Sequence, residues 1–180
     1  MDRRTFLKRG AIGGAVLFLG AGGLAAFPSG ELAQPTRPLA VLAPRAFGVL
    51  VAIAKRVVTV EGADAVAIAH GVDDALRQAN VQTQADVNAV IMLFENALAG
   101  VIFDGRFMPF TRCSPEKQDA VLDAWRRSSV AIRRSGYAAL KQLCLLAHYV
   151  QPGNASWFGY PAPLPYPLVS EDSKFGAPPS

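Results

Sequence analysis

The stretch TQADVNAVIMLFENALAGVI, residues 83–102, has the most decisive pattern in this chain. Its apolar side chains recur every three or four residues, which places them on one face of an α-helix. That face is formed by Val87, Val90, Ile91, Phe94, Leu98, Val101 and Ile102. Thr83 and Asp86 precede it with the spacing of a capping box. We predict a helix here and, because Met92 and Leu93 widen the apolar face, expect it to be the central helix.

Four more segments have the same period and predict helices over residues 44–61, 64–80, 114–128 and 129–150. Pro44 suits a first helical position, and Ser114-Pro115 combines a cap with such a proline. The last two helices are expected to bury Val121, Ala124, Trp125, Ser128, Ile132, Leu140, Leu143, Cys144, Ala147 and Val150. The sequence contains no convincing hairpin or βαβ pattern. The predicted fold class is therefore all-α, a small bundle of about five helices.

Proline-rich segments flank this helical domain of residues 44–150. Residues 28–43 contain Pro28, Pro35 and Pro38 and are predicted to form a linker. Residues 151–180 hold seven of the 13 prolines and predict an extended C-terminal arm. The arm also carries the aromatic residues Trp157, Phe158, Tyr160 and Tyr166. Disordered tails are usually poor in aromatics, so part of the arm should be buried, against the bundle or another chain.

The first nine residues, MDRRTFLKR, resemble a twin-arginine export signal. The matching residues are Arg3, Arg4, Phe6, Leu7 and Lys8. An apolar, glycine-rich run of 16 residues follows, from Ala11 to Ala26, while Asp2 departs from the usual Ser or Thr. Residues 1–27 are therefore expected to direct export to the periplasm by a route that carries folded proteins. An ordinary secretory signal or an uncleaved membrane anchor is the alternative.

Charge is concentrated in two places. Residues 1–10 carry a net +3 of the total of +4, so the remaining 170 residues carry only +1 and do not indicate a nucleic-acid partner. Residues 112–141 hold seven basic and three acidic side chains. This cluster is either a solvated helix end and turn, or a docking patch for an acidic partner or anionic lipid headgroups.

The two cysteines are compatible with a disulfide. If the last two helices form an antiparallel hairpin turning near Ser129, Cys113 lies 16 residues before the turn and Cys144 lies 15 after it. They would then stand at the same level of the hairpin, and an oxidising compartment would allow the bond. The alternative is two separate buried thiols.

No motif for catalysis, metal binding or cofactor binding stands out. Cys144 and His148 share a helix face, yet only one other cysteine and one other histidine, His70, exist to complete a metal site. The glycines of residues 10–23 follow no strand, and Cys-x-x-Cys-His is absent. We expect no metal, no cofactor and no catalytic residue on this chain. An enzyme that uses Cys144 and His148 is therefore the least favoured hypothesis. The two others, a subunit of a larger complex and an independent scaffold, are given below.

Several of these segments together resemble the gluconate 2-dehydrogenase subunit 3 family. The resemblance spans most of residues 1–165 and includes the twin-arginine start, Leu42-Ala43-Pro44 and Phe107-Met108-Pro109-Phe110. His148-Tyr149 then leads through Ser156-Trp157 to Phe158-Gly159-Tyr160-Pro161-Ala162-Pro163. Ala162 replaces a glycine of the family's Gly-Tyr-Pro-Gly-Pro pattern.

The resemblance implies a small, non-catalytic subunit of a periplasmic FAD-dependent sugar or alcohol dehydrogenase, associated with the membrane through the complex. Its partners would be the large flavin subunit, a cytochrome c subunit in some complexes, and the twin-arginine translocase. The small subunit would supply the export signal and assist assembly of its partner. The partner interface expected from it is Trp157, Gly159, Tyr160, Pro161 and Pro163. An independent exported helical binding or scaffold protein is the alternative.

Overall fold

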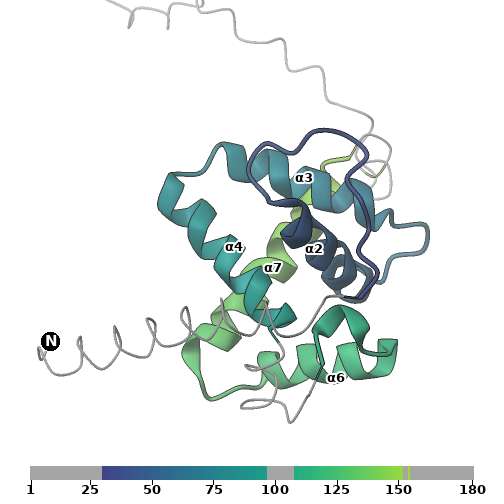
Figure 1. Ribbon diagram of the computed structural model, residues 1–180, viewed down its shortest axis with the longest axis vertical. Helices are drawn as coiled ribbons and strands as arrows, with labels where there is room; N and C mark the ends of the chain where they lie inside the picture. Colours follow the sequence, from purple (N-terminus) through teal and green to yellow (C-terminus); the bar gives the residue numbers. More distant parts are fainter. Residues whose placement is uncertain (1–29, 97–107, 152–153, 155–180) are drawn as a thin grey trace, which may run out of the picture. The chain divides into compact units, whose positions relative to one another are not determined.

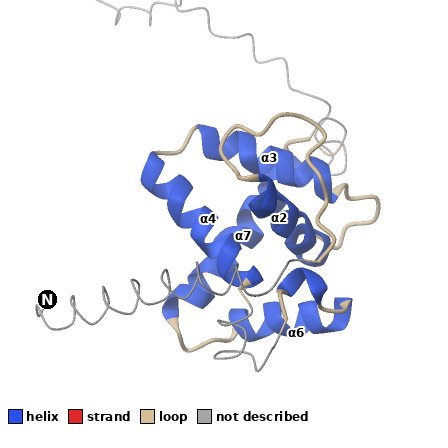
Figure 2. Cartoon of the chain, in the orientation of Figure 1, coloured by secondary structure: helices blue, strands red, loops and turns tan. Residues whose placement is uncertain are grey.

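A computed structural model of the chain describes residues 30–96, 108–151 and 154. The helices in these ranges are α2 (Pro44–Val57), α3 (Ala65–Arg77), α4 (Val81–Glu95), the 3₁₀-helix η1 (Phe110–Arg112), α6 (Pro115–Arg126) and α7 (Ala131–Tyr149). The described ranges contain five α-helices and no strand, so the all-α fold class is confirmed for them (Figure 2). The chain divides into two compact units at residue 148, and the description below concerns the first of them.

Helix α2, rather than the helix predicted over residues 83–102, is the centre of the fold. It contacts α3, α4, α6 and η1 (Figure 1). Eight of its residues are buried, among them Phe47, Leu50 and Ile53 with no exposed surface. The prediction of a central α4 was wrong because the N-terminal half of α4 faces solvent, where Val81 is 79 % exposed. Helix α4 ends at Glu95 because the backbone of Asn96 is extended, so the predicted single helix over residues 83–102 was wrong at this point. Leu98, Val101 and Ile102 lie outside the described residues.

The helix starts follow local capping chemistry. Ser114 caps α6 as predicted, its side chain accepting from the amide of Lys117, and Asp64 caps α3 in the same way. The predicted cap at Thr83 was wrong. Asn80 caps α4 instead, and its side-chain oxygen accepts the amide of Thr83 at 2.8 Å. The side-chain oxygen of Asn80, three residues before Thr83, is therefore the cap, and the helix begins at Val81.

The core joins α4, η1 and α6 through aromatic rings. Phe94 stacks on Trp125 with ring centroids 3.7 Å apart, and Phe110 meets Phe94 edge-on at 5.8 Å. Such ring pairs add stability beyond the area that they bury.

Helix α7 packs against the other helices largely with the predicted face. Leu140, Cys144 and Ala147 are buried and Leu143 packs against the core, whereas Ile132 and Val150 are exposed. Its buried residues up to His148 are Arg133, Gly136, Leu140, Cys144, Ala147 and His148. The expected core residue Ile132 is 49 % exposed, because it precedes this stripe by one position and so points about 100° away from it. Ala124 on α6 and Val150 after α7 are likewise exposed rather than buried.

Residues 30–42, which we call the strap, were predicted as part of a linker but lie against the helices. Leu42 is 4 % exposed, and Leu32, Ala33, Leu39 and Val41 pack against the hydrophobic core. The Cβ of Leu32 approaches α2 so closely that a Cβ on Gly48 would lie only 2.7 Å from it. Helix α2 is thus covered by the strap as well as by helices.

Candidate functional site

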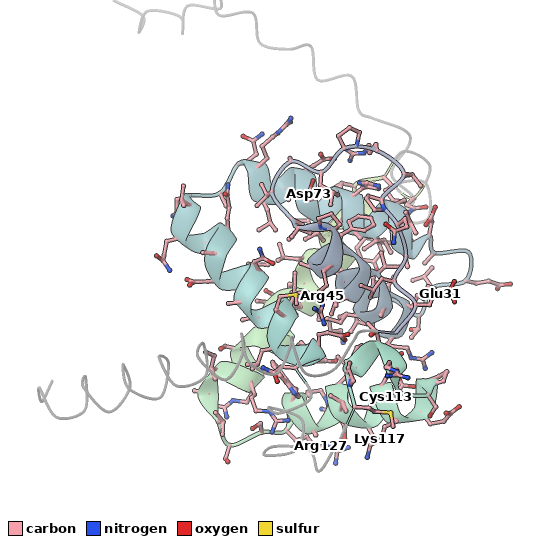
Figure 3. All side chains as sticks on the ribbon, viewed as in Figure 1. Glu31, Arg45, Asp73, Cys113, Lys117 and Arg127 are labelled. Carbon is pink, nitrogen blue, oxygen red and sulfur yellow. The ribbon has the colours of Figure 1, made fainter. Side chains whose placement is uncertain are left out.

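The most concentrated polar chemistry in the described residues holds the strap to the body. Asp73, in the middle of α3, is fully buried, and Figure 3 marks its side chain. Its two carboxylate oxygens accept three consecutive backbone amides: Ala40 at 2.6 Å, Val41 at 3.0 Å and Leu42 at 2.8 Å. One carboxylate therefore satisfies three donors of a bent segment that has no strand partner.

A second attachment involves His70, one turn before Asp73. The backbone amide of Thr36 donates to His70 Nε2 at 3.2 Å, and the Thr36 hydroxyl lies 3.1 Å from the same nitrogen. The ring is 5 % exposed and packs on Phe47 with centroids 4.6 Å apart. Because the amide must donate, Nε2 is the unprotonated nitrogen and the docked strap requires neutral His70. Burial, helped by the charge of Arg37, lowers the pKa of His70 below its ordinary value.

An exposed ion pair is a third attachment between the strap and α3. Both guanidinium nitrogens of Arg37 donate to the carboxylate of Asp74, which follows Asp73 on α3. The hydrogen bond to Arg37 lowers the pKa of Asp74. Both side chains are more than 40 % exposed, so solvent screens the pair and the two buried attachments matter more.

The beginning of the strap is attached through a relay of hydrogen bonds. The backbone amide of Gly30 donates to Thr111 Oγ1 at 2.9 Å, and that hydroxyl donates to Glu95 Oε1 at 2.7 Å. The amide of Thr111 donates to the other oxygen of Glu95 at 3.0 Å. Glu95 is 1 % exposed at the end of α4, so these bonds are shielded from water. The relay fixes the strap at its first described residue.

A groove of about 220 Å³ lies beside the strap. Its lining comes from the strap, the outer face of α2, and the start of α6: Glu31, Ala33, Gly48, Val51, Ala52, Lys55, Thr111, Cys113, Pro115 and Gln118. Glu31 and Cys113 are labelled on this side of the body in Figure 3. The lining mixes one acid, one base and several neutral groups. It has no catalytic pair within it.

Both cysteines are present as buried thiols rather than as a disulfide. The thiol of Cys113 donates to the carbonyl of Pro109 at 3.5 Å, whereas Cys144 is fully buried on α7. This is the alternative that the sequence left open. The disulfide that the sequence favoured is not formed in this structure, and the exported chain provides its own test of the bond.

The Cys144–His148 pair lies on the buried face of α7. Burial raises the pKa of Cys144 to about 12, so its reactive thiolate is scarce near neutral pH. Within residues 30–96 and 108–151, no group of three or more His, Cys, Asp or Glu residues could hold a metal ion. No described helix has the length and apolar character needed to cross a membrane.

The remaining predicted site residues lie outside the described residues. These are the signal residues Arg3, Arg4, Phe6, Leu7 and Lys8, and the interface residues Trp157, Gly159, Tyr160, Pro161 and Pro163. Asp73, His70 and Glu95 were not among the predicted site residues. The only sequence signal for them was an acid, a histidine and an acid placed on otherwise apolar helix faces.

The basic cluster is partly neutralised by local ion pairs. Asp123 is shared by Arg126 and Arg127 at 2.7 and 2.8 Å, whereas Asp119 pairs with Arg56 of α2, which lies outside the cluster. Arg133 is buried, with its guanidinium 5.3 Å from the centre of the Trp125 ring. The cluster thus contributes to the core as well as to the surface.

Comparisons with known protein families, with curated proteins and with solved structures gave no match.

Proposed function

We propose that this chain is the export and assembly subunit of a periplasmic flavin dehydrogenase complex. It would supply a twin-arginine signal to a large FAD-binding subunit, and the substrate chemistry would reside on that partner. The alternative is an exported helical scaffold that acts without such a partner.

The observation that carries this proposal is the order of its parts. A twin-arginine pattern at Arg3 and Arg4 precedes a helical body to which the chain is attached from Gly30 onward. The twin-arginine route requires its cargo to be folded before transport. A signal joined to a cooperatively held body suits that requirement.

The strap supports the proposal because its attachments come from elements far apart in the sequence. Glu95 and Thr111 hold Gly30, while His70 and Asp73 hold residues 36–42. All of these groups converge only after α3, α4 and η1 have assembled. Strap docking is therefore a consequence of folding, which suits a route that transports folded proteins.

The partner assignment depends on the resemblance to the gluconate 2-dehydrogenase subunit 3 family. Its most distinctive segment is Ser156-Trp157 through Pro163, where Trp157 and Tyr160 are the anchors that we propose for the partner. Large aromatic side chains contribute disproportionately to binding energy when a partner buries them.

The first test is purification of the tagged chain from periplasm and membranes, followed by mass spectrometry and a flavin absorbance scan. A stoichiometric large subunit with the absorbance of FAD would support the proposal. Trp157→Ala and Tyr160→Ala should each weaken its recovery, whereas the matched change Tyr166→Ala should weaken it less. A colourless chain recovered alone from both fractions would favour the scaffold alternative.

A further inference from the structure

The turn between α6 and α7 combines strong positive charge with exposed apolar side chains. Residues 123–134 contain four arginines and a single acid, Asp123, which gives a net charge of +3. Asp123 is shared by Arg126 and Arg127, whose side chains are 53 % and 70 % exposed. The third exposed arginine, Arg134, donates to the neutral carbonyl of Ser128 at 2.6 Å. Positive charge therefore remains in excess at this turn, and Figure 3 shows Arg127 there beside α6.

This charge opposes the local electrostatics of the helix that follows. The N-terminus of an α-helix carries partial positive charge and is stabilised by acids in its first turn. The first turn of α7 has no acid and instead leads into Arg133 and Arg134. Such an arrangement costs stability in the isolated chain, and a negatively charged partner would offset that cost.

Apolar side chains are exposed in the same turn and at the start of α7. Val130 is 38 % exposed and Ile132 is 49 % exposed, although both belong to the types that are usually buried. In the sequence they lie between Arg126 and Arg127 before them and Arg134 after them. The turn thus combines exposed apolar side chains with neighbouring cations.

We propose that the α6–α7 turn is a contact for an anionic phospholipid surface. Val130 and Ile132 would enter the headgroup region, while Arg126, Arg127 and Arg134 would bind lipid phosphates. Amphipathic surface elements bind membranes by this combination of apolar burial and attraction to anionic lipid. Two exposed aliphatic residues beside exposed arginines suit a deformable anionic lipid interface, whereas a tight protein partner would bury a broader face with an aromatic anchor. The inference does not depend on the identity of any partner subunit.

The test uses the full chain with an environment-sensitive fluorophore on Val130→Cys. The native cysteines are buried, and the site of labelling is verified by mass spectrometry. The matched control carries the label on Val81→Cys, an equally aliphatic and 79 % exposed site at the start of α4. Vesicles with and without phosphatidylglycerol are compared at low and high salt. We expect a blue shift only at Val130, only with anionic vesicles, and reversed by salt.

A second variant measures the contribution of the arginines. Arg126→Gln with Arg127→Gln should raise the half-saturating lipid concentration on the order of 30-fold, from about fivefold for each arginine. Circular dichroism checks that the variant is folded. If it is not folded, the salt dependence of vesicle binding by the original chain gives an independent measure of the arginine contribution. Residues 1–27 are common to all variants, so a difference between variants is assigned to the turn and not to this segment.

A Val130 label that remains in water while the chain is bound to anionic vesicles would overturn the proposal. So would equal shifts at Val130 and Val81, or a shift with purely zwitterionic lipid. Photocrosslinking from position 130 to an acidic protein, without a lipid-dependent shift, would also overturn it and would assign the turn to a protein interface.

Discussion

At the scale of single residues, the buried carboxylate of Asp73 has the largest structural role. It is fully buried and satisfies three backbone amides of the strap. A buried group with several charge-assisted bonds is costly to alter, because the unsatisfied donors stay away from water. The strap should therefore respond strongly to conservative changes at this residue.

We predict that Asp73→Asn lowers the free energy of unfolding by about 2–3 kcal/mol. The asparagine NH₂ group would face amides that need an acceptor. Urea denaturation measures the loss, and hydrogen exchange should show reduced protection of the amides of residues 40–42. The matched control is Asp86→Asn on the exposed face of α4, expected to change stability by about 0.5 kcal/mol or less. Equal effects of the two changes would contradict the role given to Asp73.

His70 makes strap docking sensitive to pH. Its pKa in the folded chain is lowered by burial and by Arg37, while Asp73, Asp74 and Asp64 act in the opposite sense with less effect. Between the lowered pKa and the ordinary value of about 6.5, the unfolded chain binds more protons than the folded chain. The contribution of neutral His70 is therefore complete above about pH 6.5 and is lost as the pH falls through the folded-state pKa.

We predict that stability falls below pH 6.5 with a slope of at most about 1.4 kcal/mol per pH unit from this residue. The measurement is the free energy of unfolding between pH 8 and pH 5, for the original chain and for His70→Gln. The glutamine cannot titrate, so the difference between the two chains should shrink toward low pH. A difference that stays constant over this range would exclude His70 as the titrating group.

The two cysteine thiols give a third test at this scale. Cys144 is fully buried with a pKa raised to about 12, and disulfide formation requires attack by a thiolate. On the proposed route the chain folds before it reaches an oxidising compartment. We therefore predict that the exported chain keeps both thiols, which alkylate only after unfolding. A mass two hydrogens lower under non-reducing conditions would instead establish the Cys113–Cys144 bond.

At the scale of helices, the approach of α3 to α7 depends on two small residues. A Cβ placed on Gly71 would lie 3.0 Å from the Cβ of Ala147 and 3.5 Å from its backbone. A methyl group fixed to a helix backbone cannot rotate away, so the helices themselves would have to separate. This contact explains a glycine that weakens α3 when that helix is considered alone.

We predict that Gly71→Ala destabilises the chain by about 1–3 kcal/mol despite the higher helix propensity of alanine. The double variant Gly71→Ala with Ala147→Gly should recover part of this loss because it restores the space. Thermal or urea unfolding of both single variants and the double variant gives the coupling energy. Additive effects would show that the two residues do not limit the approach of the helices.

At the scale of the whole molecule, the proposed export signal precedes the strap in the sequence. If the chain exports a partner, both proteins should depend on the same two arginines. This dependence separates an escort subunit from a scaffold that is exported alone.

We predict that Arg3→Lys with Arg4→Lys leaves both this chain and its large partner in the cytoplasm. Cell fractionation with quantitative mass spectrometry measures both proteins in each compartment. The matched control is Arg126→Lys with Arg127→Lys, a second adjacent pair in the same chain, which should leave export unchanged. Normal export of the partner with a retained small chain would rule out the escort role.

The sequence by itself determined the all-α class and the starts of three helices, at Pro44, after Asp64 and after Ser114. These features are local: a helix is held by bonds between residues four apart, and its caps lie within three residues of the amides they satisfy. The period of the apolar residues is therefore sufficient to reveal them. The same locality explains why the cap of α4 was misplaced by only three residues.

Only the tertiary structure decided that α2 is central, that Ile132 is exposed and that the strap is docked. The bonds that hold the strap join residues 31 to 81 positions apart, such as Leu42 with Asp73 and Gly30 with Thr111. No local pattern encodes which distant carboxylate will meet which amide. That choice depends on how the helical faces pack together, because packing determines which polar groups lose water and must find a partner.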